Sequence, residues 1–190
     1  MDDEKGPQNG PENGPENGLA VAPDRAGLMA RLDALQIAHR TVEHPAVFTV
    51  EEGRDLKASM PGAHSKNLFV KDKKGALYLI SAWAETRIDL VGLGKALGAK
   101  GRFSFGKPEL MSKTLGVIPG AVTPFALFHE SAHALAGFVL DAAFMDKDPL
   151  WFHPLENTAS TAIGPRDLVR FAESCGFTPE IMDLAAPAPA

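Results

Sequence analysis

The stretch Lys66-Asn67-Leu68-Phe69-Val70-Lys71 is followed by Asp72-Lys73-Lys74-Gly75 and then by Ala76-Leu77-Tyr78-Leu79-Ile80-Ser81-Ala82. The two outer segments are mostly apolar, while the segment between them is short, polar and closed by glycine. This arrangement is typical of two strands joined by a tight turn. We therefore predict a hairpin with strands at 66–71 and 76–82.

Helix signals surround this hairpin. Asp24 is placed to cap a helix that carries Leu28, Leu32 and Leu35 on one face and ends near Ile37. Two further helices are predicted to begin around prolines, which are favourable in a first helical turn. The other predicted helices are a short one at 49–57 and further ones at 88–97, from 107 onward and at 166–174. Extended structure is predicted at 41–50, and strands at 137–140, 150–153 and 158–163.

Strands and helices alternate irregularly in this prediction, with hairpins and few strand–helix–strand repeats. The pattern favours one α/β domain, built on a mixed β-sheet or partial barrel and surrounded by helices. The first 18 residues contain two Pro-Glu-Asn-Gly repeats and no large apolar residue after Met1. We expect residues 1–18 to form a disordered low-complexity tail and residues 19–190 to form the single domain.

Composition narrows the class of protein. With 190 residues and 45% hydrophobic content, the chain can form one full core. No apolar run approaches the roughly 18 residues that a membrane-spanning helix needs, so we expect a soluble protein. The single Cys175 allows no internal disulfide, which is consistent with a reducing compartment and with a cytoplasmic location.

Charge is distributed unevenly along the chain. Residues 54–113 carry twelve Lys and Arg against five Asp and Glu, a net charge of +7 within a chain whose net charge is −5. A basic segment in an acidic protein suits a phosphate-rich partner, although a solvated face beside acidic neighbours explains the charge about as well.

Two features could carry chemistry. Lys66 begins an apolar strand, where it is either a solvated flank or a fixed positive charge aimed at a phosphate or carbonyl oxygen. Asn67 should face the other side of the strand, because side chains alternate. In Gly120-Ala121-Val122-Thr123-Pro124, glycine and proline frame small residues whose backbone N–H groups could stabilise an oxyanion, or the segment is an ordinary turn.

Four motifs occur together and in order: His44-Pro45-Ala46-Val47-Phe48-Thr49, Lys66-Asn67-Leu68-Phe69, Gly120-Ala121-Val122-Thr123-Pro124-Phe125 and His153-Pro154-Leu155-Glu156-Asn157. Together they resemble the prolyl-tRNA editing family, which comprises freestanding YbaK-like domains and the insertion domain of bacterial prolyl-tRNA synthetases. The resemblance extends from about residue 24 to 183 and is closest to the branch that acts on alanyl-tRNA(Pro).

The resemblance implies the editing-domain fold and a trans-editing deacylase that hydrolyses mischarged Ala-tRNA(Pro), without a cofactor or metal. Its partners would be the aminoacylated end of tRNA(Pro) and, as a further candidate, prolyl-tRNA synthetase. By the same resemblance, Lys66 and Gly120 would be the catalytic positions. The substrate-binding positions would be Asn67, Ala121, Val122, Thr123, Pro124, Phe125 and His153.

A different enzyme class is suggested by His129-Glu130-Ser131-Ala132-His133, which matches the His-Glu-x-x-His pattern of zinc peptidases. On a helix capped by Thr123 the two imidazoles would lie one turn apart, with Glu156 as a conceivable third ligand. In the resembled family this stretch is instead a turn before the strand at Phe138. A third alternative is a noncatalytic tRNA-binding module, whereas a cysteine nucleophile has no supporting motif.

Overall fold

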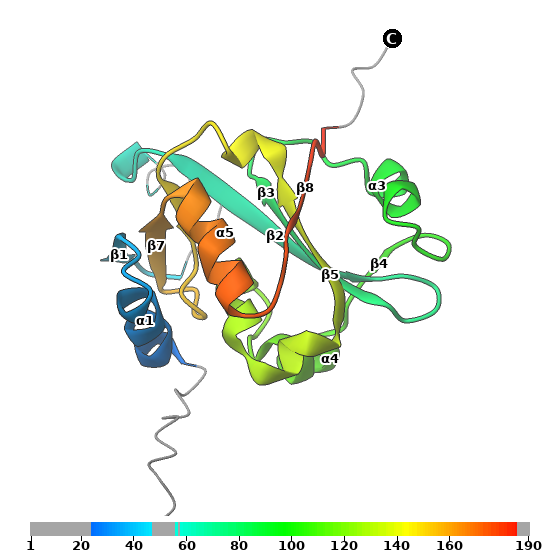
Figure 1. Ribbon diagram of the computed structural model, residues 1–190, viewed down its shortest axis with the longest axis horizontal. Helices are drawn as coiled ribbons and strands as arrows, with labels where there is room; N and C mark the ends of the chain where they lie inside the picture. The colour runs from blue at the N-terminus through cyan, green and yellow to red at the C-terminus, as the bar shows by residue number, and fades with distance from the viewer. Residues whose placement is uncertain (1–23, 47–55, 57, 186–190) are drawn as a thin grey trace, which may run out of the picture.

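The computed structural model describes residues 24–46, 56 and 58–185. Its centre is an eight-stranded mixed sheet with the order β1-β7-β6-β2-β3-β5-β8, to which β4 is added beside β2. Helices α1, α3, α4 and α5 lie around this sheet (Figure 1). The predicted fold class, a mixed sheet surrounded by helices, is therefore confirmed.

The elements have the following bounds. The strands are β1 (His39–Glu43), β2 (Ala63–Lys71), β3 (Leu77–Trp83), β4 (Ser104–Phe105), β5 (Leu135–Asp141), β6 (Leu150–Phe152), β7 (Ala159–Ile163) and β8 (Glu180–Met182). The helices are α1 (Arg25–Ala34), α3 (Leu90–Ala96), α4 (Pro108–Leu115) and α5 (Pro165–Ser174), with 3-10 turns η1 (Pro124–Phe128), η2 (Glu130–Ala134) and η3 (Ala142–Phe144).

Strand β2 joins the two halves of the sheet. Its first residues pair in parallel with β6, and from Ser65 onward it pairs antiparallel with β3. At its far end Val70 and Lys71 also pair with β4. The hairpin predicted from the sequence is thus confirmed. Its turn is closed by Asp72, whose carboxylate accepts the N–H groups of Lys74 and Ala76.

Alternation along the central strands creates two apolar layers. Leu77 and Leu79 of β3 belong to the main core, which also contains residues of α1, α4, α5 and η1. Tyr78 and Ile80, on the opposite face, pack in a smaller cluster with Leu93 of α3. Because side chains of successive residues point to opposite faces, a sheet covered on both sides buries consecutive residues of its central strands.

The helix starts follow the predicted chemistry. The carboxylate of Asp24 accepts the N–H of Gly27 at 2.8 Å and caps α1. Pro108 and Pro165 occupy the first turns of α4 and α5, where a missing N–H is tolerated. Gly176, with φ of 85°, follows the end of α5. In the described part of the chain no helix is both long and apolar enough to cross a bilayer.

Two predictions concern residues outside the described part of the chain. The tail at residues 1–18 is one, and the other is most of the short helix predicted at 49–57.

Replacing Phe125 by Ala should lower the free energy of unfolding by about 3–5 kcal/mol. Phe125 is 0% exposed and packs edge-to-face on Phe152 and Phe171. Urea denaturation would measure the change. The control is Phe105→Ala, which removes an identical ring that is 65% exposed and should change stability by no more than about 0.5 kcal/mol. Equal effects of the two substitutions would contradict the packing described for Phe125.

Candidate functional site

A small pocket lies where β2, β6 and β7 meet the segment after β1. Its volume is about 160 Å³. Apolar side chains form part of the wall, and the polar groups come from histidine, serine and asparagine. The lining residues are His44, Leu56, Met60, His64, Ser65, Asn67, Trp151, Phe152, His153 and Ser160. No Asp, Glu, Lys or Arg is among these described residues.

Pairing of β1 with β7 brings two distant residues of the pocket together. Glu43 lies opposite Ala159, and the N–H of His44 donates to the carbonyl of Thr158 at 2.9 Å. As a result, the Nε2 of His44 lies 3.0 Å from the Oγ of Ser160, while its Nδ1 lies 2.9 Å from the carbonyl of Pro45. A carbonyl only accepts, so Nδ1 of His44 is the donor there and, in the neutral ring, Nε2 accepts the Ser160 hydroxyl.

His153 follows β6 and faces His44, with 6.0 Å between the ring centroids. Its Nδ1 donates to the carbonyl of Ala159 at 2.9 Å. Burial lowers the pKa of His153 below the usual histidine value; the hydrogen bond to Ala159 opposes this shift, and the nearby His44 adds to it. The ring is therefore neutral near pH 7, and Nε2 keeps a lone pair as a hydrogen-bond acceptor.

The floor of the pocket comes from alternate residues of β2. The hydroxyl of Ser65 donates to the carbonyl of Trp151 at 2.8 Å and accepts the amide Nδ2 of Asn67 at 3.3 Å. The other amide atom of Asn67, Oδ1, is buried and has no hydrogen-bond partner among the described residues. A buried acceptor without a partner is destabilising by about 1–3 kcal/mol, which a bound donor would relieve.

Lys66 lies on the opposite face of β2 from Ser65 and Asn67. Its ammonium donates to the carbonyl of Ala84 at 3.0 Å and to the carbonyl of Thr86. The hydroxyl of Thr86 in turn donates to Asp141 at 2.5 Å. Lys66 thus holds the turn after β3 and does not line the pocket.

The Gly120–Pro124 segment has both buried and solvent-exposed residues. Ala121, Thr123, Pro124 and Phe125 are buried, and Thr123 caps η1 by accepting the N–H of Phe125. Gly120 is exposed, has φ of 91° and lies beside Asn157, whose Nδ2 is 3.7 Å from where a Cβ on this glycine would stand. Within the described residues, the N–H groups of Gly120 and Val122 donate to no other group.

The loop and the 153–157 turn are therefore neighbours at Gly120 and Asn157. Of the predicted site residues, the structure places Asn67 and His153 in one pocket. It places Lys66 and the whole predicted segment from Gly120 to Phe125 outside the pocket lining.

The helix required by the zinc-peptidase alternative is absent, and that prediction is wrong. His129 has extended dihedral angles, φ −72° and ψ 131°, which separate η1 from η2. Its Nδ1 accepts the N–H of Ser131 at 3.2 Å, whereas His133 stacks on Phe177 with ring centroids 5.4 Å apart. Glu156, the conceivable third ligand, binds Arg25 at 2.8 Å. The family-based expectation of a turn before the Phe138 strand describes this stretch correctly.

Sequence reasoning did not assign His44, His64, Ser65, Trp151 or Ser160 to the site. Ser65 could have been found, because it lies two residues before Asn67 on a predicted strand and shares its face. His44 and Ser160 are 116 residues apart and meet only through the β1–β7 pairing, so no local signal connects them.

The chain is similar to several known proteins. The family model described as "Aminoacyl-tRNA editing domain" matches residues 44–171, more than half of the chain. A Bos taurus protein named "Prolyl-tRNA synthetase associated domain-containing protein 1" is 40% identical over 170 residues, which are 87% of this chain and 98% of that protein. "Prolyl-tRNA editing protein ProX" of Acetoanaerobium sticklandii is 29% identical over 161 residues, 84% of this chain and 97% of its own.

Among solved structures, one reported for a candidate trans-editing enzyme for prolyl-tRNA synthetase has a TM-score of 0.67 at 21% identity. The match covers 88% of this chain and 100% of the chain in that structure, and it supports the fold alone. The family model and the bovine relative carry the assignment further, and the range that the family model matches, residues 44–171, spans all four sequence motifs. The chain belongs to the aminoacyl-tRNA editing domain family.

Proposed function

We propose that this protein is a trans-editing deacylase that hydrolyses the ester bond of mischarged Ala-tRNA(Pro). The observation that carries the proposal is the pocket of about 160 Å³, whose described lining residues include no Asp, Glu, Lys or Arg and are partly apolar. A cavity of this size accommodates a small acyl group. Membership of the editing family supplies the reaction class, and the name of the relative ProX, a prolyl-tRNA editing protein, suggests prolyl-tRNA as the object of editing.

Selectivity is steric in this proposal. In the proposal, the methyl side chain of alanine packs against Leu56, Met60 and Phe152, which line the pocket, and the shape of this wall, not the cavity volume, excludes the ring of proline. Correctly charged Pro-tRNA(Pro) is thereby spared. This is the second filter of a two-step selection, in which the synthetase rejects large amino acids and the editing site removes small ones.

Hydrolysis of an aminoacyl ester demands little from the protein. Water adds to the ester carbonyl, the carbon–oxygen bond to the ribose breaks, and alanine and free tRNA are released. In our proposal a ribose hydroxyl beside the ester helps to orient the water. The N–H groups of Gly120 and Val122, which donate to no other described group, hold the carbonyl oxygen as negative charge develops on it.

Lys66 has two roles in the proposal. Two of its N–H groups order the turn at Ala84 and Thr86. The remaining N–H meets a phosphate of the terminal nucleotide, so that the ordered turn fixes the direction of the ammonium.

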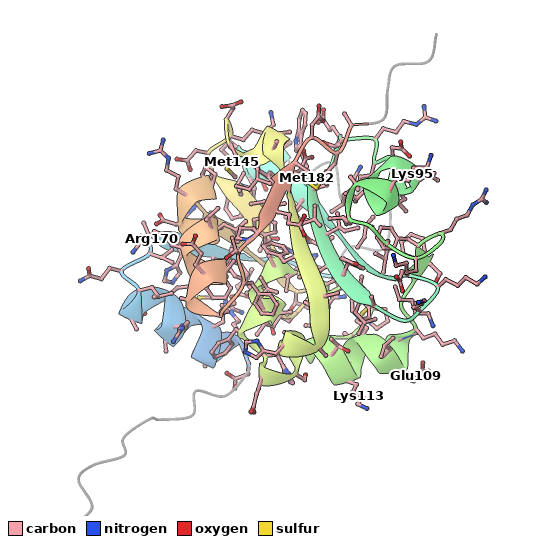
Figure 2. The ribbon with its side chains drawn as sticks, turned by 45° about the vertical axis from the view of Figure 1, so that its right-hand side comes forward. Lys95, Glu109, Lys113, Met145, Arg170 and Met182 are labelled. Carbon is pink, nitrogen blue, oxygen red and sulfur yellow. The ribbon has the colours of Figure 1, made fainter. Side chains whose placement is uncertain are left out.

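The basic segment gives a surface for tRNA phosphates. Lys73 and Lys100 are exposed neighbours, since the N–H of Lys73 donates to the carbonyl of Lys100 at 2.8 Å. Lys95 of α3 and Lys113 of α4 also extend outward from their helices (Figure 2). None of these cations forms a salt bridge with a described carboxylate. Asp72, between them in the fold, accepts backbone N–H groups, above all that of Lys100, which lowers its pKa.

The partners in this proposal are the acceptor end of tRNA(Pro) and prolyl-tRNA synthetase, which produces the mischarged substrate. The location is the cytoplasm, where such a synthetase works. The noncatalytic binding module is the remaining alternative, and it predicts tRNA affinity without turnover.

The direct test is a panel of tRNA(Pro) charged separately with Ala, Ser, Cys and Pro. We expect kcat/KM for the alanyl ester to exceed that for the prolyl ester by about 100-fold, because the pocket excludes the ring. A metal chelator and the His133→Ala variant should both leave the rate unchanged. Binding of tRNA without release of any amino acid would favour the noncatalytic module.

Replacing Lys66 by Ala should reduce deacylation of Ala-tRNA(Pro) by about 100-fold or more, since it removes both the phosphate contact and the support of the 84–86 turn. Lys66→Arg keeps a cation and should retain more activity than Lys66→Ala. Circular dichroism and thermal unfolding would show whether the fold persists. Wild-type turnover by Lys66→Ala would refute both roles.

The double change Lys73→Glu with Lys100→Glu should weaken tRNA binding and lower the slope of log K against log[salt] by about 2, one unit for each lost phosphate contact. Turnover at saturating tRNA should stay the same. The matched control is Arg166→Glu, a charge reversal at an exposed position of α5. A control effect as large as that of the double variant would argue against a localised tRNA surface.

A further inference from the structure

A groove separate from the proposed editing pocket lies between helix α3 and the segment at residues 99–103. Its volume is about 530 Å³, within the roughly 300–1,000 Å³ that is typical of small-ligand sites. It shares no described lining residue with the editing pocket. Apolar side chains, among them Val91 and Phe103, line the groove together with the cations of Lys95 and Arg102, and no described lining residue is Asp or Glu.

Local backbone chemistry forms the two sides of the groove. Asp89 caps α3, since its carboxylate accepts the N–H of Val91 at 3.0 Å. Behind the helix Gly98 has a φ of 65°, a conformation that favours glycine, and the N–H of Ala99 then donates to the carbonyl of Gly94 at 2.9 Å. The chain therefore turns back beside α3, and residues 99–103 form the other side of the groove.

The apolar part of the groove includes an aromatic ring. Phe103 meets Tyr78 edge-on, with 5.2 Å between the ring centroids, and thus rests on the smaller core cluster. The ring remains partly exposed, and Val91 of α3 is 55% exposed. A ligand with a flat apolar face would remove both surfaces from water.

The two cations of the groove are available to a ligand. Lys95 and Arg102 are exposed, and neither side chain forms an ion pair or a hydrogen bond with a described residue. The carboxylate of Asp89, close to both in the chain, is already occupied as the cap of α3. The charge of the groove therefore suits an anion.

The groove continues into the basic surface. Gly101 lines the groove, and a Cβ on this glycine would stand 3.1 Å from the Cβ of Lys73. The N–H of Lys73 donates in turn to the carbonyl of Lys100. A polyanion that follows Lys73 and Lys100 would thus reach Arg102 without leaving the surface.

We propose that this groove binds one unpaired nucleotide of the tRNA, with the base against Val91 and Phe103 and the adjoining phosphates beside Lys95 and Arg102. The ligand class is a single-stranded nucleotide within a polyanionic strand. The inference rests on the proposed function, in which tRNA is the substrate. It adds a recognition site for a base at a place where no ester is hydrolysed.

The shape of the site favours RNA over an acidic peptide. The apolar surface is one hollow, whereas an amphipathic helix needs a longer groove that accepts side chains at i, i+3, i+4 and i+7. Cations that continue along the surface match phosphates repeated along a strand. Stacking of a base on an aromatic ring together with such cations is the usual way in which proteins hold single-stranded nucleic acid.

The experiment measures the binding of three probes to the full chain by fluorescence anisotropy. The probes are a short single-stranded oligoribonucleotide, a sugar–phosphate chain of the same length without bases, and an acidic peptide of the same net charge. We expect the oligoribonucleotide to bind about tenfold more tightly than the chain without bases, because only its bases enter the groove. The peptide should bind no better than the chain without bases.

Variants assign the preference for bases to the groove. Val91→Ser should lower the affinity ratio of the first two probes about threefold, because it makes the wall polar. Lys95→Gln with Arg102→Gln should weaken both probes equally and lower the slope of log K against log[salt] by about 1.4. The matched control is Ile181→Ser, which makes the same kind of change at a 44% exposed position of β8 outside the groove and should leave the ratio unchanged.

Equal affinities for the oligoribonucleotide and the chain without bases would overturn the inference, whether or not Ala-tRNA(Pro) is hydrolysed. Tighter binding of the peptide than of the RNA would overturn it in favour of a protein partner. An effect of Ile181→Ser as large as that of Val91→Ser would also count against it. A ratio that only Val91→Ser lowers, in a protein that hydrolyses no aminoacyl ester, would support the groove and contradict the proposed deacylase.

Discussion

Strand β2 is the element on which the arrangement of the site depends. It pairs in parallel with β6 at Ala63 and His64 and antiparallel with β3 from Ser65 onward, so it belongs to both halves of the sheet. Because side chains alternate along a strand, this register directs Ser65 and Asn67 to one face and Lys66 to the other, while His64, at the start of the strand, also lines the pocket. A shift of one residue would exchange the two sets. The two sheet pairings hold the register, and the apolar layers on both faces oppose any slip.

The pocket and the basic surface are physically different kinds of site. The pocket is small, has no Asp, Glu, Lys or Arg among its described lining residues, and contains histidines whose protonated ring nitrogens are fixed by backbone carbonyls. The basic surface is exposed, and its cations have no carboxylate partners among the described residues. Under the proposed function, the two sites have separate roles, one in tRNA affinity and the other in selectivity for the acyl group. Phosphate attraction supplies affinity that depends on salt, and the pocket decides which acyl group is hydrolysed.

Local motifs were informative only where their residues act locally. Thr123 caps a turn beside Pro124, as the sequence indicated, yet the turn ends at His129 instead of continuing as a helix. The sequence therefore matches the His-Glu-x-x-His pattern, but the backbone does not form the helix that would place the two imidazoles one turn apart. Likewise, Ala121 and Phe125 belong to a binding motif by resemblance, but the structure buries both in the main core. A motif residue can thus serve the fold while its neighbour Gly120 remains exposed.

The sequence by itself determined the hairpin, the helix starts at Asp24, Pro108 and Pro165, and the family, because turn chemistry, capping and residue order are local properties. It also placed Asn67 and His153 among the residues of one site, through the resemblance. Only the tertiary structure brought His44 to Ser160, turned Lys66 toward the carbonyls of Ala84 and Thr86, and left Oδ1 of Asn67 without a partner. These contacts depend on strand pairing between distant segments, and long-range pairing leaves no periodic signal in the chain that forms it.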